Sequence, residues 1–217
     1  MVFAAYLLDI EGTTTPIDFV TRTLFPYARK YLSQYVQSGI SSEILVELEQ
    51  EPDWSGSRDL VEYLQSLMDQ DRKSTGLKMI QGQIWESGYA SGELHAEIYP
   101  EVELAMRNWI KAGATLHIFS SGSVLAQRLL FGHLPEGDLT PLITSYFDTT
   151  TGPKRVPESY GKIANSIGRN PAEILFLSDI IEEVDAARAV GMTATQVLRG
   201  TEVNDFPRAI SSFLQIS

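Results

Sequence analysis

The sequence predicts an α/β protein, with a doubly wound parallel sheet and a helical unit inserted after its first strand. Four short apolar runs end in small or polar residues, as buried strands of a parallel sheet do: VFAAYLLDI, ATLHIFSS, EILFLSD and TATQVL. Helical patterns separate the last three runs. Strands and helices that alternate at this spacing are typical of a doubly wound sheet.

Helical periodicity is clearest on either side of the third apolar run. Before it, apolar residues recur at i, i+3, i+4 and i+7, with Pro157 near the helix start and Gly168 as the stop: Tyr160, Ile163, Ala164 and Ile167. After it, a second stripe ends at Gly191: Ile181, Val184 and Ala187. We therefore expect a helix before and a helix after this strand.

The stretch between the first two apolar runs carries helical stripes and no convincing strand. The stripes are Ala28, Tyr31, Leu32 and Tyr35; Ile44, Leu45 and Leu48; and Leu60, Tyr63, Leu64, Leu67 and Met68. The turn-rich segment 86–100 is the expected return hinge. We therefore expect a core domain of residues 1–16 and 100–217 and an inserted helical domain of residues 17–99.

Composition limits the kinds of partner this chain can have. Its 217 residues carry a net charge of -11, which argues against binding nucleic acid or an anionic membrane surface. Without cysteine there is no disulfide, no thiolate nucleophile and no Cys-containing zinc site. The first apolar run lacks a basic leader and is too short to span a bilayer, so we expect a cytoplasmic protein. An anionic substrate would need a local positive group or a metal ion.

Polar side chains gather where the predicted strands end. Because parallel strands share one carboxyl edge, the residues that follow them should lie close together. These residues are Asp9 and Glu11, then Ser120 and Ser121, then Ser178 and Asp179, with Lys154 in the segment DTTTGPKR. Taken singly, each could be a cap or a solvated loop residue. Together they make up the parts of a metal-assisted phosphoryl-transfer site.

Each part has a chemical reason. Asp9 could attack phosphorus and form an aspartyl-phosphate, which divides one hard displacement into two easier ones. Mg²⁺ would remove the repulsion between this carboxylate and the phosphate, with Asp9 and Asp179 as ligands. The third ligand would be the carboxylate or the backbone carbonyl of Glu11. Candidate metal ligands are therefore Asp9, Glu11 and Asp179.

Proton transfer and phosphate binding fall to the remaining residues. Glu11 lies two residues after Asp9, so both side chains point the same way if the strand geometry persists, and Glu11 could exchange protons with the reacting oxygens. Ser121 and the amides near Gly122 lie at a helix N-terminus, which suits phosphate oxygens. Lys154 supplies local positive charge.

This set of residues resembles the haloacid dehalogenase (HAD) superfamily, whose first motif has the form D-x-D-x-T or V. Here it is DIEGT, with Glu11 in place of the second Asp. That replacement resembles the enolase-phosphatase E1 family, also called acireductone synthase, of methionine salvage. Further segments match this family in order: QGQIWESGY, SGEL, SSGSVLAQRLLFGH, GDL, FDT, GPK, SY, LFLSD and AVGM.

The resemblance implies an HAD-like fold and a bifunctional, Mg²⁺-dependent enzyme, with one ion per subunit. Its substrate would be 2,3-diketo-5-methylthiopentyl-1-phosphate, which is first enolised and then dephosphorylated to the acireductone. By motif, Asp9, Glu11 and Lys154 are the catalytic candidates, and Ser120, Ser121 and Lys154 the substrate-binding ones. Residues 17–99 would be a cap over the site. Glu183 would support Lys154 or metal-bound water, and the enzyme is expected to be a monomer.

Several alternatives remain open at this point. Another Mg²⁺-dependent HAD phosphatase, for phosphoglycolate or a sugar phosphate, would share most of these residues but normally has Asp at the position of Glu11. A dehalogenase proper needs neither metal nor this second acid. A phosphorelay receiver domain lacks the helical insertion, and an acidic binding protein would require all the strand ends to be caps. The enolisation base could be Glu11 or Lys154, and His117, inside a strand, is expected to be a core residue.

Overall fold

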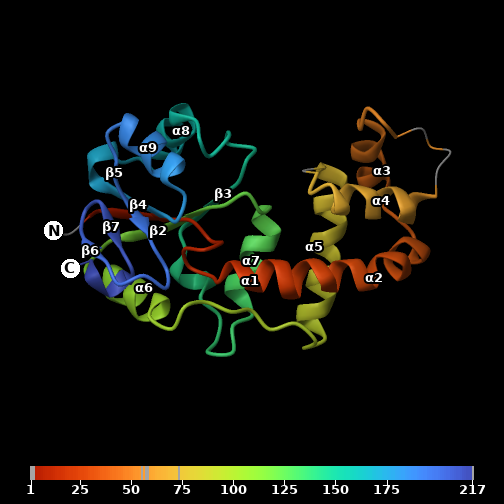
Figure 1. Ribbon diagram of the computed structural model, residues 1–217, viewed down its shortest axis with the longest axis horizontal. Coiled ribbons are helices and arrows are strands. Elements are labelled where there is room, and N and C mark those ends of the chain that lie inside the picture. Colours follow the sequence, from red (N-terminus) through yellow and green to blue (C-terminus); the bar gives the residue numbers. More distant parts are fainter. Residues whose placement is uncertain (1–2, 55, 57–58, 73, 217) are drawn as a thin grey trace. The chain divides into compact units, whose positions relative to one another are not determined.

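The structure is a computed structural model and describes residues 3–54, 56, 59–72 and 74–216 (Figure 1). The chain forms two compact units, Met1–Ile17 with Ala96–Ser217, and Asp18–His95. The domain bounds expected from the sequence, 17–99 for the inserted part, differ from these by one residue at the first boundary and by four at the second. The role of the inserted unit as a cap stays a prediction.

A seven-stranded sheet forms the centre of the first unit, with the order β3-β2-β1-β4-β5-β7-β6. All neighbouring strands are parallel except β6 and β7. Their bounds are β1 Ala5–Leu8, β2 Thr115–Phe119, β3 Ser145–Phe147, β4 Ile174–Ser178, β5 Thr193–Val197, β6 Asn204–Asp205 and β7 Ala209–Ile210. The strand order reverses at β1, because β2 lies on one side of it and β4 on the other. This confirms the predicted doubly wound α/β fold.

The four apolar runs correspond to β1, β2, β4 and β5, as predicted. The sequence analysis did not predict β3, β6 or β7. These strands have three, two and two residues, so they are too short to show an apolar run or an alternation. The sheet therefore extends further at both edges than the sequence pattern indicated.

Helices cover both faces of this sheet. They are α6 Val102–Lys111, α7 Val124–Gly132, α8 Pro157–Ile167 and α9 Ile181–Ala189, with short 3₁₀ turns at Thr140–Leu142, Pro171–Glu173 and Phe213–Gln215. Figure 1 shows α8 and α9 on one side of the strands and α6 on the other. The predicted helices α8 and α9 are confirmed, and Gly168 ends α8 with a φ of 73°.

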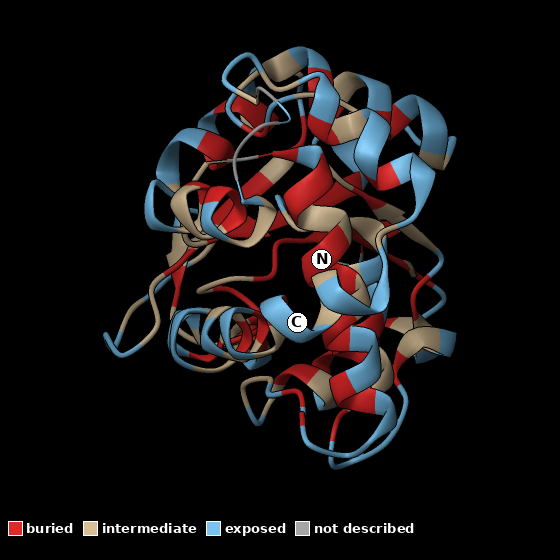
Figure 2. Cartoon of the chain, turned by 90° about the vertical axis from the view of Figure 1, so that its right-hand side faces the viewer, coloured by how far each residue is buried: buried red, intermediate tan, exposed pale blue. Residues whose placement is uncertain are grey.

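Alternate strand residues pack against these two helical layers. Leu7 and Phe176 join the core beneath α8 and α9, where they meet Tyr160 and Val184. On the opposite face Tyr6 stacks on Trp109 of α6, with ring centroids 4.1 Å apart. The central strands β1, β2 and β4 and the inner helix faces are largely buried, whereas outer helix faces are exposed (Figure 2). Burial on both faces explains why the strand sequences are continuously apolar.

The second unit is helical throughout its described secondary structure. Its helices are α1 Ile17–Phe19, which begins at the end of the first unit, a π-helical turn Val20–Leu24, α2 Phe25–Ser38, α3 Ser42–Glu49, α4 Leu60–Asp69 and α5 Thr75–Ala90. The predicted stripes correspond to α2, α3 and α4. The hinge predicted from residue 86 was wrong at its start, because α5 continues to Ala90. Gly88 lies inside this helix and packs closely against the ring of Tyr27.

Among the described residues, no helix combines the length and apolar character that crossing a membrane would need.

Candidate active site

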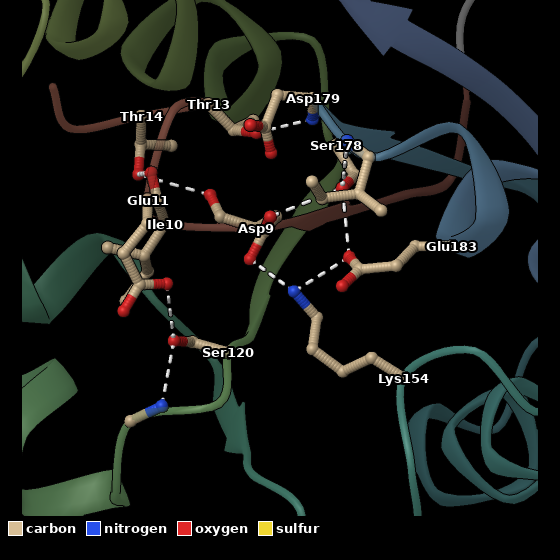
Figure 3. A network of polar contacts seen from close by, with 12 residues as sticks. Asp9, Ile10, Glu11, Thr13, Thr14, Ser120, Lys154, Ser178, Asp179 and Glu183 are labelled. Atoms are coloured by element: carbon tan, nitrogen blue, oxygen red, sulfur yellow. Dashed lines mark hydrogen bonds and ion pairs between the residues drawn. The ribbon is translucent and has the colours of Figure 1, made fainter. Parts of the chain in front are cut away.

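Four segments of the first unit meet at the carboxyl edge of its sheet (Figure 3). Asp9 follows β1, Ser120 follows β2 and Asp179 follows β4, while Lys154 comes from the segment before α8. This edge lies where the strand order reverses, which is the usual ligand position in an open parallel sheet. The topology therefore brings together residues that are up to 170 positions apart in the sequence.

The Asp9 backbone is held from two sides. Its N–H donates to the carbonyl oxygen of Leu177 at 3.0 Å, and its carbonyl accepts from Thr14 Oγ1 at 3.1 Å. Neither contact involves the Asp9 side chain. The side chain itself is buried, with 2% of the residue exposed. Burying a carboxylate is unfavourable unless opposite charge and hydrogen-bond donors accompany it.

Lys154 supplies this opposite charge. Its Nζ lies 2.5 Å from Asp9 Oδ1 and 2.8 Å from Glu183 Oε2, and all three side chains are buried (Figure 3). Tyr160 fixes the Lys154 backbone by donating its hydroxyl to the Lys154 carbonyl at 2.7 Å. Burial opposes the charge on the amine, but Asp9 and Glu183 together raise the pKa of Lys154 above its usual range.

Ser178 connects Asp9 to Glu183. Its Oγ lies 2.9 Å from Glu183 Oε2 and 3.2 Å from Asp9 Oδ2, and it accepts from the N–H of Ile180 at 3.2 Å. Burial, and then the charge of Asp9, raise the pKa of the Glu183 carboxyl. Glu183, which the sequence analysis expected only in a supporting role, thus holds Lys154 directly.

Asp179 faces the turn that follows Asp9. Its N–H donates to Thr13 Oγ1 at 2.9 Å. Gly12 has a φ of 73°, and a Cβ at this glycine would lie 2.4 Å from Asp179 Oδ2, so the close approach requires glycine. Burial, and then the charge of Asp9, raise the pKa of Asp179 to about 6. The hydrogen bond from Asp179 to Thr13 and the packing of Gly12 thus fix Asp179 against this turn.

Glu11 reaches the end of β2. Its carboxylate accepts from Ser120 Oγ at 3.2 Å, and Ser120 Oγ in turn accepts from the N–H of Gly122 at 3.1 Å. Burial, and then the charge of Asp9, raise the pKa of Glu11. Ser121 is exposed at the same strand end. The cap of α7 is Ser123, whose side chain accepts from Ala126, so Ser120 is not a helix cap.

The oxygen atoms at this edge suit a small divalent cation in two respects. Asp179 Oδ1 is buried and has no hydrogen-bond partner in the described part of the chain, and the repulsion between Asp9 and Asp179 is what a cation would remove. No group of three or more His, Asp or Glu side chains in this part is arranged to hold a metal ion. The carboxylates of Asp9 and Asp179 are the oxygen donors at this edge whose chemistry fits such an ion.

The structure thus brings together Asp9, Glu11, Ser120, Lys154, Asp179 and Glu183. The sequence analysis gave no role to Thr13 and Thr14, whose hydroxyls bond to the backbone of Asp179 and Asp9. A signal was available for Thr14, because hydroxyl residues in a turn commonly bond nearby backbone groups. What the sequence could not show is that the Thr13 hydroxyl bonds a residue 166 positions away.

Comparison with known proteins places this chain in a family. A family model described as haloacid dehalogenase-like hydrolase matches residues 3–191. A protein of Synechococcus elongatus named enolase-phosphatase E1 is 49% identical, over 89% of this chain and 87% of its own length. One of the same name from Azotobacter vinelandii is 46% identical, over 100% of this chain and 98% of its own. The chain belongs to the enolase-phosphatase E1 family.

Enolase-phosphatase E1 is also the family that the sequence resembled, and that prediction is confirmed. The chain is therefore an enzyme of the HAD-like hydrolases, a phosphatase for phosphoric monoesters with the enolase-phosphatase function of methionine salvage. Enzymes of this family generally depend on Mg²⁺. Among solved structures, the UTR4 protein of Saccharomyces cerevisiae is similar, with a TM-score of 0.79 and 37% identity over 97% of this chain and 98% of that one.

Proposed function

We propose that this enolase-phosphatase acts on 2,3-diketo-5-methylthiopentyl-1-phosphate, enolises it, and then hydrolyses the enol phosphate to the acireductone and phosphate. One observation carries the proposal. A buried carboxylate, Asp9, is paired with a buried ammonium, Lys154, beside a second acid whose Oδ1 has no hydrogen-bond partner in the described part of the chain. Such an arrangement supports nucleophilic attack on a phosphorylated substrate in an otherwise acidic protein.

In the phosphatase step, a carboxylate oxygen of Asp9 attacks phosphorus while the bond to the leaving oxygen breaks. Glu11 donates its proton to that leaving oxygen. Glu11 then takes a proton from water as this water attacks the phosphorus of the aspartyl-phosphate, which releases phosphate and restores Asp9. Ser120 and Ser121 bind the phosphorylated substrate at the start of the segment that leads into α7.

In the enolisation step, we assign Lys154 and Glu11 to different tasks. Lys154 is ion-paired on two sides, with Asp9 and Glu183, and so serves as a cation that polarises a substrate carbonyl. The Glu11 carboxylate accepts from the Ser120 hydroxyl, and we propose that its longer side chain reaches a carbon-bound proton of the substrate. In this step Glu11 takes the proton from carbon and delivers it to the carbonyl oxygen that Lys154 polarises, which forms the enol. Glu11 then takes up a proton from solvent before it donates one to the leaving oxygen in the phosphatase step.

One Mg²⁺ ion per subunit, held by Asp9, Asp179 and Glu11, would neutralise the charge that builds up between phosphate and carboxylates. We place the Glu11 contribution at its backbone carbonyl, since its carboxylate accepts from Ser120. The inserted unit is proposed as the cap that excludes water during the reaction. We further propose a cytoplasmic monomer that binds neither nucleic acid nor membrane, in keeping with its net charge of -11.

The purified protein, mixed with Mg²⁺ and the diketone phosphate, tests the proposal directly. Absorbance follows the enol, and a coupled assay follows phosphate. We expect the enol to accumulate before phosphate appears, and both signals to vanish when Mg²⁺ is chelated. Phosphate release without any enol or acireductone would instead indicate a general HAD phosphatase, and the proposed substrate would be wrong.

Asp9→Asn separates the two half-reactions. Asparagine keeps the shape of Asp9 but is not a nucleophile, so we expect phosphate release to fall by at least about 10³-fold. Enol absorbance should still rise, because Glu11 and Lys154 remain. The measurement is the same two-signal assay, and full phosphate release by this variant would remove Asp9 as the nucleophile.

A further inference from the structure

Arg199 joins three segments of the first unit at one point. It lies two residues after β5, and 12% of its side chain is exposed. Its Nε and Nη2 both donate to the carbonyl oxygen of Thr13, at 3.1 and 2.5 Å. Its Nη1 forms an ion pair with Glu101 and donates to the carbonyl oxygen of Ser211 at 3.2 Å. A planar guanidinium can make all these contacts at once, which an ammonium cannot do.

Two aromatic rings complete the surroundings of Arg199. The guanidinium carbon lies 4.0 Å from the ring centroid of Tyr99 and 4.9 Å from that of Phe213. The N–H of Tyr99 donates to the carbonyl oxygen of Thr14 at 2.9 Å. Arg199 therefore fixes the outgoing turn at Thr13 and the returning chain at Tyr99, on the core side of the insertion.

The turn held by Arg199 is the one that contacts Asp179. Thr13 presents its carbonyl to Arg199 and its hydroxyl to the N–H of Asp179. The preceding residue, Gly12, packs against the Asp179 carboxylate so closely that a Cβ would collide with it. A displacement of Thr13 would therefore be passed on to Asp179 through a hydrogen bond and a packing contact.

We propose that Arg199 is a positioning residue for the enolase-phosphatase reaction, which holds Thr13 so that Asp179 is aligned for Mg²⁺. The inference rests on the proposed function, which assigns Asp179 to the metal. Arg199 acts only through Thr13. Groups that orient a metal ligand from behind affect metal affinity by about 10- to 100-fold.

Arg188 offers a matched control within the same unit. Its Nε and Nη2 donate to the carbonyl oxygen of Ala194 at 3.0 and 2.7 Å, and its Nη1 lies 3.4 Å from Asp185 Oδ1. The contacts are of the same kind as those of Arg199, an arginine fork on one carbonyl with an acid as partner. Ala194, however, lies near the start of β5, away from the carboxyl edge.

The experiment compares Arg199→Lys and Arg199→Met with Arg188→Lys and Arg188→Met. Mg²⁺ affinity is measured by titration calorimetry without substrate, at a temperature where melting curves show each variant folded. We expect the Arg199 variants to bind Mg²⁺ about 10-fold or more weakly and the Arg188 variants to stay within about twofold of the wild type. At subsaturating Mg²⁺, kcat should fall for the Arg199 variants while KM for the phosphate ester changes little.

Thr13→Val tests the intermediate link, because it keeps the side-chain volume but removes the hydroxyl that accepts from Asp179. Combined with Arg199→Lys, it should add little to the loss of Mg²⁺ affinity, since both changes act on one path. Fully additive losses would contradict that path.

The proposal and the proposed function fail in different ways. If the wild type binds Mg²⁺ and the Arg199 variants bind it equally well, Arg199 has only a structural role and the inference is wrong, while the proposed function stands. If the wild type shows no Mg²⁺ binding, the assignment of Asp179 to the metal is wrong, and the inference falls with it.

Discussion

Each unit of the protein contains a cation held between two acids, and the two clusters differ in burial. In the first unit Lys154 lies between Asp9 and Glu183, with 6%, 3% and 9% of these side chains exposed. In the second unit Arg72 lies 2.9 Å from Glu51 and 2.8 Å from Asp53, with 28%, 14% and 45% exposed. The charges match, but water reaches only the second cluster freely.

This difference in burial indicates that the Lys154 cluster serves the chemistry, whereas the Arg72 cluster has a structural role. Two carboxylates and an ammonium that are all buried pay a large desolvation cost, so such a cluster is weak evidence for stability and stronger evidence for chemistry. Partly exposed pairs cost little to form and contribute little, typically about 1 kcal/mol or less. Mutations in the two clusters should therefore have very different consequences.

Lys154→Met should produce the largest effect. It leaves the Asp9 and Glu183 carboxylates buried without their cation, which costs about 3–5 kcal/mol of folding free energy when no Mg²⁺ is present. Activity should fall by at least about 10²-fold, because the positive charge near the substrate is lost. Urea unfolding in chelator and phosphate release with Mg²⁺ measure the two effects.

Lys162→Met is the control for this variant, since Lys162 is an exposed lysine of α8 that bonds the Thr151 carbonyl. It should change neither quantity appreciably. Adding Glu183→Gln to Lys154→Met removes one unpaired charge and should restore part of the stability without restoring activity. If Lys154→Met kept activity within a few-fold of the wild type, the buried cluster would be structural after all.

His117 provides a further comparison, because it is a buried titratable side chain of the first unit whose pKa is shifted by burial. Its Nε2 lies 2.9 Å from Thr115 Oγ1, and burial lowers the pKa of His117 to about 4. An unfolded histidine titrates near about 6.5. Between these values the unfolded chain takes up a proton that the folded chain does not, so stability should fall as the pH drops from about 6.5 to 4 and the loss should level off below that.

His117→Gln should remove this part of the pH dependence. At about 1.4 kcal/mol per pKa unit, the difference from the wild type amounts to about 3 kcal/mol across the window. Urea unfolding at several pH values from 4 to 7 measures it, and His95→Gln, at an exposed position, is the matched control. Equal slopes for the His117 variant and the wild type would show that His117 has the same pKa in the folded and unfolded protein, and the predicted lowering by burial would be wrong.

Arg72→Met should have the smallest effect. We expect only a slight loss in unfolding free energy, and less in 1 M salt, where exposed pairs are screened. Phosphate release should be unchanged. A loss of unfolding free energy as large as that of Lys154→Met, persisting in high salt, would mean that the second cluster is as critical as the first, and the contrast between the units would disappear.

The sequence predicted the elements whose residues carry a strong local pattern. Strands buried on both faces read as apolar runs, and helices ended by Gly168 or Gly191 read as periodic stripes with stops. The short strands β3, β6 and β7 were not predicted, because their strand conformation depends on pairing with neighbouring strands rather than on local composition. The sequence analysis predicted no stripe for the helix α5 and placed the hinge over its last residues, which contain Gly88 and other turn-forming residues.

For the site, the sequence predicted acids and a lysine at the strand ends, and the structure brings Asp9, Lys154 and Asp179 to one edge. The shared carboxyl edge of a parallel sheet made that possible. Arg199 lay outside the prediction, because its value depends on contacts with a carbonyl 186 positions away. Backbone carbonyls occur at every position, so no sequence pattern marks the one that an arginine binds.

The hydrogen bonds that hold the Asp9 backbone make the Asp9→Asn variant suited to forming a stable complex with the unreacted substrate. Because Leu177 and Thr14 form hydrogen bonds with the main chain of Asp9, we expect a substitution of its side chain to leave the backbone in place. Crystals of the Asp9→Asn protein could then be soaked with the intact phosphate ester, which would persist long enough for diffraction. With the backbone fixed in this way, the chemical shift of an isotope-labelled asparagine at position 9 would change when the substrate binds, and NMR would detect it.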